Sequence, residues 1–385
     1  MSSLFPTYSR WEIEPDWAEG SIMYGKDGKK YLDYTSGIGV CNLGHRPKVV
    51  EEAIQEQLKK FWHVSNLFPV EIQETAAAKL AQAAEMDLVF FSNSGAEANE
   101  AAIKLSRKAT GRSKIITFNQ SFHGRTYATM SATGQDKIKH GFGPMLETFI
   151  YVPFNDLAAL KEVMSDEVAA VMLEVIQGEG GIHPASKEFL DGVEALCKEY
   201  GSLLVIDEIQ TGIGRTGKPF AFQHYGLKPD IVSVAKGLGS GLPIGGIIAK
   251  GNLKDVFGPG SHGTTFGGNP LSVSSALATM DAIFQDSFLA EVNEKADFFR
   301  AALEENLLPL PNVNEIRGIG MMIGIEINQN VPDLLKNLRS NGFIALPAGE
   351  NVIRLLPPLT TTKSELEEAI DILTKVLTQN LGAAV

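Results

Sequence analysis

The sequence predicts an α/β protein with a large, mostly parallel sheet and a second, smaller α+β unit. Short apolar runs alternate with helical patterns through the middle of the chain, and several runs are apolar throughout, as strands covered on both faces are. After Asn269 this alternation gives way to long helical patterns with few strands between them. The chain has 385 residues, more than the roughly 250–300 at which a single hydrophobic core usually stops growing. Two domains are therefore expected.

Seven apolar runs are predicted to be the strands of the large sheet. One helix between them is especially clear, because Ser186 precedes it, Gly201 follows it and apolar residues recur on one face from Lys187 to Tyr200. Cys197 lies on that face, so we expect it in the core rather than in a reactive site. The seven strands are expected at Leu88–Phe91, Lys114–Phe118, Thr148–Val152, Ala169–Val175, Leu203–Ile206, Ile231–Val234 and Gly246–Ala249.

The C-terminal part of the chain is predicted to form the smaller unit together with the N-terminus. Two helical patterns run from Asn269 to about Leu307, and the apolar segments Met321–Ile327 and Val352–Leu356 flank a short helix. The last helix opens with a capping box, Thr362–Glu365. We expect residues 36–270 to form the large domain, and residues 1–35 with 271–385 to form the small one.

Composition narrows the class of protein. The net charge is -12, so a nucleic-acid surface, which needs clustered Lys and Arg, is not expected. Only Cys41 and Cys197 are present and no CxxC spacing occurs, which favours a reducing compartment, a cytoplasmic location and no metal centre. No segment approaches the roughly 20 apolar residues that span a bilayer, and the start lacks the features of a signal peptide, so no membrane contact is expected.

Polar and glycine-rich segments follow five of the predicted strands. Because ligands bind beyond the carboxyl ends of parallel strands, these segments are expected to meet in one crevice. The segments are Asn93–Ala96, Phe122–Arg125, Gln177–Gly180, Asp207 and Lys236.

Lys236 and Asp207 are the central pair of this constellation. Each has an ordinary interpretation, a surface charge for Lys236 and a turn cap for Asp207. An ATPase is excluded, because no Gly-Lys-Ser or Gly-Lys-Thr accompanies the acidic strand end.

Five of the ten residues from Gly237 to Gly246 are glycine, and a lysine desolvated among such backbone loses its proton readily and can form a Schiff base with an aldehyde. A carboxylate on a neighbouring strand could hold the ring nitrogen of a pyridoxal cofactor protonated.

Two further segments could bind a phosphate. Ser94, Gly95 and Ala96 stand at the start of a predicted helix, whose first free N–H groups form an anion site, although an ordinary capped helix has the same pattern. Thr264 and Thr265, in "GTTFGGNP", offer hydroxyl and amide groups within what is otherwise a glycine-rich turn.

Taken together, these segments resemble the ornithine-type, class III aminotransferases that use pyridoxal phosphate. The resemblance covers nearly the whole chain and implies the type I fold of pyridoxal-phosphate-dependent transferases and a homodimer with shared active sites. It is carried by "GKKYLDYTSGIGVCNLGH", "FFSNSGAEANEAAIK", "FHGRT", "EVIQGEGG", "LLVIDEIQTGIGRTG", "AKGLGSGLPIGG", "GTTFGGNP" and "NVIRLLPPL".

The resemblance implies a role for each candidate residue toward the cofactor. Lys236 would bind it covalently and transfer the proton, and Asp207 would pair with the pyridine nitrogen. Phe122 would stack on the ring, and Gln210 would lie near the ring hydroxyl. The remaining expected cofactor contacts are Ser94, Gly95, Ala96, Glu208, Ile209 and, from the neighbouring subunit, Thr265.

Four residues are expected to contact substrate. Arg125 matches the arginine that such enzymes use for a substrate carboxylate, for which a planar guanidinium suits bidentate binding. Glu179 and Arg354 match a pair that acts as a gate, joined when the amine donor is bound and parted when glutamate needs Arg354. Thr264 completes the set. His123 is interpreted as structural, and an ordinary surface ion pair is the alternative for the charged residues.

The implied activity is transfer of the δ-amino group of N-acetylornithine to 2-oxoglutarate, within arginine synthesis. Relatives that act on ornithine itself place a tyrosine near Ile38, where this chain reads Gly37-Ile38-Gly39, so an acylated α-nitrogen is favoured. The alternatives are ornithine, succinylornithine or 4-aminobutyrate as donor, an aminomutase that needs no external oxo acid, and a non-catalytic phosphate-binding protein. The segment Gly44-His45-Arg46-Pro47 departs from the family pattern, and no function is assigned to it.

Overall fold

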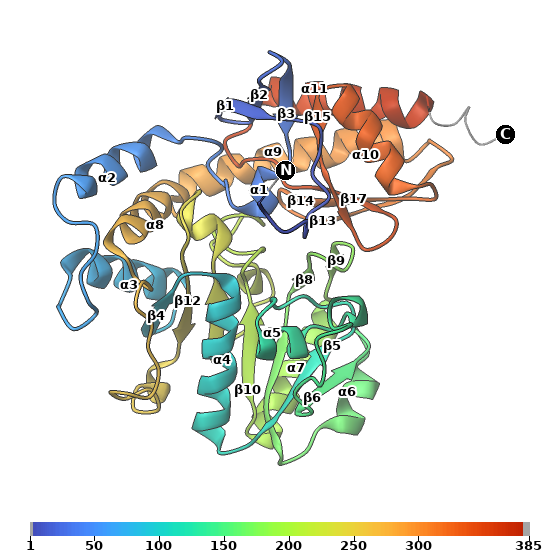
Figure 1. Cartoon of the computed structure of the whole chain (residues 1–385). Coiled ribbons are helices and arrows are strands. Elements are labelled where there is room, and N and C mark those ends of the chain that lie inside the picture. Colours follow the sequence, from blue (N-terminus) through green and yellow to red (C-terminus); the bar gives the residue numbers. More distant parts are fainter. Residues whose placement is uncertain (1–2, 380–385) are drawn as a thin grey trace.

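The centre of the molecule is a seven-stranded sheet that occupies the lower half of Figure 1, in a computed structural model that describes residues 3–379. All strands are parallel except β12, which runs antiparallel to both of its neighbours, β11 and β4. The predicted mostly parallel sheet is therefore confirmed. In spatial order the strands are β4 Leu88–Ser92, β12 Gly245–Ala249, β11 Ile231–Val234, β10 Leu203–Asp207, β7 Val168–Leu173, β5 Lys114–Phe118 and β6 Phe149–Val152.

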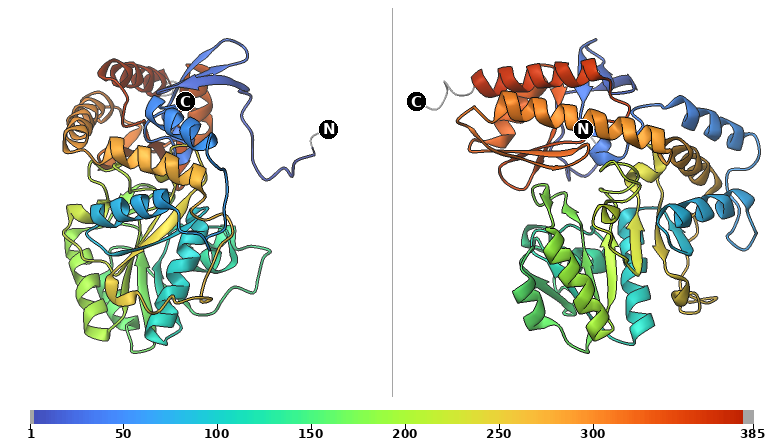
Figure 2. Two further views of the ribbon diagram at one scale, coloured as in Figure 1. Left: turned by 90° about the vertical axis from the view of Figure 1, so that its left-hand side faces the viewer. Right: turned by 180° about the vertical axis from the view of Figure 1, so that it is seen from behind.

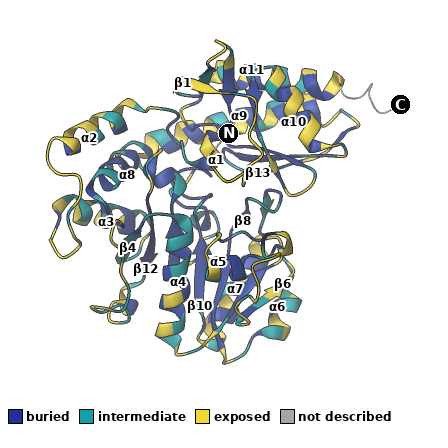
Figure 3. Ribbon diagram, viewed as in Figure 1, coloured by how far each residue is buried: buried dark blue, intermediate teal, exposed yellow. Residues whose placement is uncertain are grey.

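Helices cover both faces of this sheet, which explains why its strands are apolar throughout. In β10, Leu204 and Ile206 belong to the cluster that includes Phe189 of α7 (Lys187–Tyr200), whereas Val205 packs into the cluster around Ala101 of α4 (Gly95–Thr110). Figure 3 shows the strands buried and the outer turns of the surrounding helices exposed. The smaller helices of this region are α5 Tyr127–Ala132 and α6 Leu157–Val163.

The two ends of the chain meet in the upper half of the molecule. The N-terminal strands β1 Pro15–Glu19, β2 Ile22–Gly25 and β3 Lys30–Asp33 are extended by β15 Phe343–Ile344, which pairs in parallel with β3. A second four-stranded sheet has the order β13 Val313–Ile319, β14 Met322–Ile327, β17 Val352–Leu355 and β16 Leu346–Ala348. Figure 2 shows the long helix α9 (Asp286–Leu307) crossing this half, near α10 (Val331–Ser340) and α11 (Lys363–Gln379).

Three further helices lie beside the large sheet. α8 (Pro270–Ile283) packs against α2 (Lys48–Leu58) and α3 (Glu71–Ala83), so segments far apart in the sequence form one layer. A short, kinked turn, α1 (Ser36–Gly39), leads from β3 toward the large sheet. None of the helices described in residues 3–379 is both long and apolar enough to cross a bilayer.

The helix α7 is confirmed at its predicted ends. Ser186 caps its N-terminus by accepting a hydrogen bond from Phe189, and Gly201 closes it in the left-handed conformation. The capping box of the last helix is also confirmed, because the Thr362 N–H donates to the Glu365 carboxylate and the Thr362 hydroxyl accepts from the Glu365 N–H.

Some elements were missing from the sequence prediction or misplaced by it. The strands β1–β3 and β13 were not expected, and the strand predicted at Ala169–Val175 stops at Leu173. It stops because the next residue, Glu174, accepts hydrogen bonds from the N–H groups of Phe122 and Gly178, so the chain leaves the sheet there. We retain as a proposal the division into residues 36–270 and residues 1–35 with 271–385, of which residues 1–2 and 380–385 lie outside the described part of the chain.

Candidate active site

A cavity of about 440 Å³ opens at the carboxyl ends of the parallel strands. Its volume is in the range typical of small-molecule and cofactor sites. The sequence predicted that the polar segments after five strands meet in one crevice. This is confirmed, because residues from all five segments line this cavity. The lining includes Asn93, Ser94, Gly95, Ala96, Phe122, Arg125, Glu179, Asp207, Ile209, Gln210 and Lys236.

Lys236 begins a short 3₁₀ turn directly after β11 and has a left-handed backbone, with φ of 44°. Such a conformation is costly for a residue other than glycine and persists only where the surroundings impose it. The glycines that follow allow close packing rather than mobility. A Cβ at Gly237 would lie 2.3 Å from Asn42, and one at Gly245 would lie 2.4 Å from the carbonyl oxygen of Ser94. The turn is thus packed against the Asn42 side chain and the start of β12 against the Ser94 backbone, with Lys236 among the residues that line the cavity.

The protein environment lowers the pKa of Lys236 and so makes its neutral amine easier to form. Burial lowers its pKa, the nearby Glu179 carboxylate opposes this effect, and Arg354 lowers the pKa further. A neutral amine is the form that can act as a nucleophile or accept a proton, so the environment suits both chemical roles expected of Lys236.

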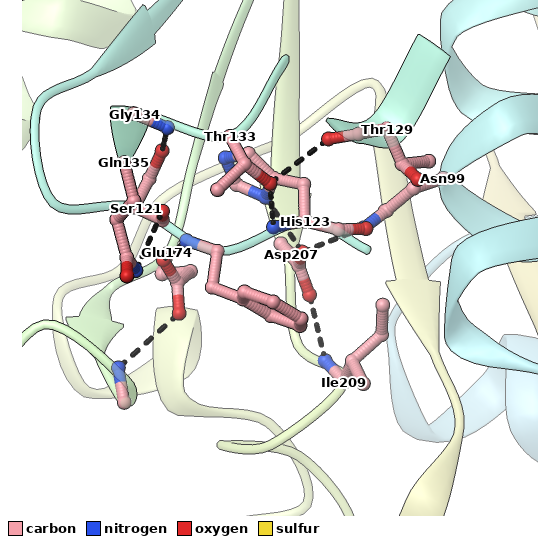
Figure 4. Close-up of polar contacts among 12 residues, drawn as sticks. Asn99, Ser121, His123, Thr129, Thr133, Gly134, Gln135, Glu174, Asp207 and Ile209 are labelled. Atoms are coloured by element: carbon pink, nitrogen blue, oxygen red, sulfur yellow. Dashed lines mark hydrogen bonds and ion pairs between the residues drawn. The ribbon is translucent and has the colours of Figure 1, made fainter. Parts of the chain in front are cut away.

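Asp207 is buried and held by three hydrogen bonds (Figure 4). Its Oδ2 accepts from Asn99 Nδ2 at 2.8 Å and lies 2.8 Å from His123 Nδ1, and its Oδ1 accepts from the Ile209 N–H at 3.0 Å. A carboxylate oxygen can accept two hydrogen bonds, so Oδ1 retains the capacity for one further donor. Because Asp207 lines the cavity, that donor could belong to a ligand.

His123 links this carboxylate to the surrounding backbone. Its N–H donates to Thr133 Oγ1 at 2.9 Å, and its carbonyl accepts from Asn99 Nδ2. Burial on its own would lower the pKa of His123, but the hydrogen bond to Asp207 and the charges of Asp207 and Glu174 raise it above its ordinary value. His123 therefore orients Asp207 and supports its negative charge, in agreement with the structural interpretation.

Glu174 is a second buried carboxyl group of the cavity wall. Its Oε2 accepts from the Phe122 N–H at 3.0 Å and its Oε1 from the Gly178 N–H at 3.2 Å. Burial raises the pKa of Glu174 to about 7, an effect that the His123 charge opposes and the Asp207 charge reinforces. One side chain therefore fixes both Phe122 and the segment that carries Glu179.

The N-terminus of α4 forms another wall of the cavity. Ser94 caps the helix by accepting from the Glu97 N–H at 3.2 Å, and Ser94, Gly95 and Ala96 all line the cavity. The first N–H groups of such a helix, with its dipole, attract a phosphate. Gly95 also has a packing role, because a Cβ there would lie 2.8 Å from the side chain of Ile209.

Glu179 and Arg354 form an ion pair beside the cavity. Arg354 Nη1 donates to Glu179 Oε1 at 2.6 Å, to Gln210 Oε1 at 3.0 Å and to the Gly178 carbonyl at 3.2 Å. Burial raises the pKa of Glu179, but the charge and hydrogen bond of Arg354 outweigh this and lower it overall. Within residues 3–379, Arg354 Nε is buried without a hydrogen-bond partner, so the guanidinium retains donor capacity.

Arg125 and Phe122 face the same cavity from the segment after β5. The Arg125 guanidinium carbon lies 5.7 Å from the centre of the Phe122 ring, and the Arg125 residue is exposed. Its guanidinium is therefore available to an incoming carboxylate.

Four predicted site residues are absent from this cavity lining: Arg354, which borders it through its ion pair with Glu179, and Glu208, Thr264 and Thr265. Glu208 is fully buried, with Oε1 accepting from the Phe222 N–H and Oε2 from Thr211, and burial raises its pKa to about 7. Thr264 and Thr265 line a separate surface pocket with His63, Ser65, Asn66 and Leu67, although Thr264 Oγ1 accepts from Asn93 Nδ2 at 3.2 Å. Within one chain, Glu208 is therefore buried outside the lining and the two threonines line a neighbouring surface, so their expected contacts with cofactor and substrate stay predictions.

The structure also adds residues that the sequence prediction had not identified. Asn99 contacts Asp207 from the middle of α4, where it looked like one polar position of an amphipathic helix. Val40 lines the cavity. Ile38, near which ornithine-specific relatives place a tyrosine, is 45% exposed and lies outside the lining. His45, in the segment that departs from the family pattern, pairs with Asp33 at 2.9 Å, and this hydrogen bond raises the pKa of His45 to about 10.

The cavity fits pyridoxal phosphate in its chemistry. A helix N-terminus, a lysine amine whose pKa is lowered by burial and a carboxylate with a free acceptor position are what its phosphate, aldehyde and ring nitrogen require. Within residues 3–379, no group of three or more His, Cys, Asp or Glu side chains is arranged as a metal site.

Comparison with known proteins agrees with this geometry. The family model "Aminotransferase class-III" matches residues 7–377. The chain is 58% identical over 371 residues to acetylornithine aminotransferase of Bacillus subtilis (strain 168), covering 96% of each protein. The structure of acetylornithine aminotransferase from Elizabethkingia anophelis matches with a TM-score of 0.87 at 32% identity, covering 97% of this chain and 96% of that one.

A third relative was solved with ligands. Taurine:2-oxoglutarate aminotransferase from Bifidobacterium kashiwanohense, in complex with PLP and glutamate, matches with a TM-score of 0.93 at 29% identity, covering 98% of this chain and 95% of that one. Class-III aminotransferases depend on pyridoxal phosphate, and the fold expected from the sequence resemblance is confirmed. The chain belongs to the class-III aminotransferases.

Proposed function

We propose that the enzyme transfers the δ-amino group of N-acetylornithine to 2-oxoglutarate, giving N-acetylglutamate semialdehyde and glutamate, as a step of arginine synthesis. The observation that carries this proposal is the Glu179–Arg354 pair at 2.6 Å beside a cavity that also holds Lys236 and Arg125. The 58% identity to acetylornithine aminotransferase of Bacillus subtilis supports the choice of donor.

The side chains of the cavity divide the chemistry among them. Bound pyridoxal phosphate supplies an aldehyde that condenses with amines and a ring that withdraws electrons from the reacting carbon. Lys236 removes the proton from the substrate carbon that carries the amino group, which its lowered pKa permits. Asp207, held by Asn99 and His123, would keep a proton on the ring nitrogen of the bound cofactor. Phe122 would restrict the ring of the bound cofactor, and the N-terminus of α4 would hold its phosphate.

Two arginines explain how one cavity accepts two substrates. Arg125 binds the carboxylate that lies far from the reacting amine, in acetylornithine and in glutamate alike. Glutamate has a second carboxylate beside its amine, which needs Arg354, whereas acetylornithine has none there. Glu179 neutralises Arg354 for the amine donor and leaves it for glutamate. This exchange of partners is the Glu179–Arg354 gate.

The glycines beside Glu179 do not supply flexibility to this gate. A Cβ at Gly178 would lie 2.4 Å from Gln210 Oε1, and one at Gly180 would lie 2.7 Å from the Gln120 carbonyl oxygen. Their role is close packing. The gate therefore works by rotation of the Glu179 side chain rather than by movement of its backbone.

A homodimer is part of the proposal. Trp62, Leu67 and Phe266 are 64%, 92% and 59% exposed, and they lie on the surface that carries Thr264 and Thr265. Exposed apolar patches of this kind mark protein interfaces. In such a dimer, Thr265 of the partner subunit would contact the phosphate. A cytoplasmic location, expected from the low cysteine content, is also retained as a proposal.

Substrate choice is tested with a panel of ω-amines and 2-oxoglutarate. The Gly37–Val40 segment presents only the apolar Val40 to the cavity lining, so the free α-ammonium of ornithine would lack an acceptor there. An unsatisfied polar group costs about 1–3 kcal/mol, so kcat/KM for acetylornithine is expected to exceed that for ornithine by about tenfold or more. Succinylornithine and 4-aminobutyrate test the remaining donors. Turnover of acetylornithine without any oxo acid would instead indicate an aminomutase.

Glu179→Gln tests the gate. The substitution leaves Arg354 unpaired, so the glutamate half-reaction is expected to hold or improve while the acetylornithine half-reaction slows by about tenfold or more, since an unpaired buried charge costs at least about 1.5 kcal/mol. Single-turnover absorbance measures each half-reaction separately, because each one leaves the cofactor in a different form. Arg125→Lys is the matched contrast, since both substrates need Arg125 and both half-reactions should weaken. Equal losses in both half-reactions of Glu179→Gln would exclude the gate.

A further inference from the structure

Glu179 lies in the loop of a small hairpin. β8 (Ile176–Gln177) pairs antiparallel with β9 (His183–Pro184), and residues 178–182 connect them. Two residues of this loop, Gly181 and Ile182, have positive φ angles of 125° and 55°. The value at Ile182 is costly for a β-branched residue, so contacts outside the hairpin must hold the loop in this shape.

Arg317, on the neighbouring strand β13, makes three hydrogen bonds to this loop. Its Nε donates to the carbonyl oxygens of Gly181 at 3.0 Å and Ile182 at 3.1 Å, and its Nη2 donates to Gly181 again at 2.8 Å. Arg317 is 7% exposed. Its guanidinium therefore binds the carbonyl oxygens of two consecutive loop residues, Gly181 and Ile182, and Ile182 is the residue with the unfavourable φ.

Two carboxylates orient this guanidinium. Nη1 donates to Glu315 Oε2 at 2.6 Å and to Glu326 Oε2 at 2.5 Å, and the hydrogen bond from Arg317 lowers the pKa of Glu326. A rigid planar fork with donors on both sides is specific to arginine, because a lysine ammonium cannot bridge the carboxylates and the loop carbonyls in the same way.

The loop is tied at two more points. Gly349, in the turn between β16 and β17, donates its N–H to the Glu179 carbonyl at 2.8 Å, and Glu174 accepts from the Gly178 N–H. With its backbone fixed on both sides, the Glu179 carboxylate reaches Arg354 at 2.6 Å. Arg354 and Arg317 lie on strands of the same sheet, so this sheet supplies both the partner of Glu179 and the clamp on its loop.

We propose that Arg317 is a positioning residue for the Glu179–Arg354 gate: by clamping the Gly181 and Ile182 carbonyls it holds Glu179 within reach of Arg354, and so sets the balance between amine donor and glutamate. This inference rests on the proposed function and extends it to a residue that lies outside the cavity lining. A displacement of about 1 Å in a positioning contact can change rates by about 100-fold, so a loosened loop is sufficient to alter the balance.

Arg317→Lys is the test, and Arg300→Lys is its matched control. Arg300 is also a partly buried arginine that donates to carbonyl oxygens of the β13 strand, Ile316 and Gly318, but its contacts do not reach the hairpin loop. Arg317→Lys is expected to lower the rate of the acetylornithine half-reaction relative to the glutamate half-reaction by about tenfold, within the range for a misplaced positioning group. Arg300→Lys should leave this ratio unchanged.

A binding measurement gives a readout that does not depend on turnover. Glutarate, a non-reactive dicarboxylate, needs Arg125 and a free Arg354, so titration calorimetry should show it binding several-fold more tightly to Arg317→Lys than to the unmodified enzyme. Unchanged glutarate affinity together with an unchanged half-reaction ratio would overturn the proposal. If Arg317→Lys does not fold, Glu326→Gln, which removes one of the orienting carboxylates, is measured in the same way.

Combination with Glu179→Gln separates this inference from the proposed function. If Arg317 acts through Glu179, the double variant should have the same half-reaction ratio as Glu179→Gln alone, whereas independent effects would multiply and count against the proposal. An unchanged ratio in Glu179→Gln itself would mean that the gate does not exist. A shifted ratio in Glu179→Gln with a normal ratio in Arg317→Lys would reject only the role of Arg317.

Discussion

Replacing Lys236 with alanine is expected to lower the rate of transamination by about 10⁴-fold, the upper range for removal of a group that transfers a proton. The substitution removes the amine that we propose as the base of the reaction, which lines the cavity after β11 and whose pKa burial lowers. The fold should survive, because the turn is shaped by its glycines and by the backbone at Lys236, not by the end of the lysine side chain.

Borohydride reduction followed by peptide mapping checks the same assignment without measuring activity. In the unmodified enzyme the cofactor should become fixed to the peptide that contains Lys236, and in Lys236→Ala no fixation is expected. Lys295→Ala is a suitable control, since Lys295 is a partly buried lysine that donates to the Leu359 carbonyl away from the cavity. Fixation on any other lysine in the unmodified enzyme would contradict the role of Lys236.

The second large effect is expected for Asp207→Asn, which should slow proton abstraction by about 10²–10³-fold, the range for loss of one preorganised electrostatic contact. The asparagine keeps the shape of the side chain but removes the charge that supports a proton on the ring nitrogen. It also places an NH₂ group where Oδ2 now accepts from Asn99 and contacts His123. Cofactor affinity should fall much less, because the phosphate site at α4 is untouched.

Two measurements distinguish these effects. Single-turnover absorbance with glutamate gives the rate of the chemical step in the occupied enzyme, and a cofactor titration gives the affinity. Glu208→Gln is the matched control, because Glu208 is the adjacent buried carboxyl group but lies outside the cavity lining. A normal single-turnover rate in Asp207→Asn, with affinity alone reduced, would show that the carboxylate serves only to bind the cofactor.

The sequence was sufficient to predict the strands of the large sheet and the residues at their ends. Fully buried strands such as β7 appear as continuous apolar runs, and the polar residue after each run is visible in the sequence. The strands β1–β3 were missed because they are short, and β1 is mostly exposed, so no apolar run marks it.

The contacts that hold the catalytic side chains could not be predicted in this way. Asn99 meets Asp207 across 108 residues of sequence, and Arg317 meets the Gly181 carbonyl across 136. Arg317 also binds backbone carbonyl groups. Because every residue type has such a group, the sequence does not show which residues Arg317 contacts. Glu174 looked like part of a strand, because only the fold shows which N–H groups it accepts from.

The meeting of the two chain ends has a consequence for the order in which a newly made molecule matures. Ser21 and Thr361 share a hydrogen bond across 340 residues of sequence, so their pairing must wait for roughly 20–70 s of synthesis at about 5–20 residues per second. Lys236, Asp207 and the start of α4 leave the ribosome well before Arg354, which lies on β17 and pairs with Glu179 175 residues away. The cofactor pocket can therefore take shape while translation continues. The ability to choose between two substrates, which depends on Arg354 in our proposal, is therefore acquired later than this pocket.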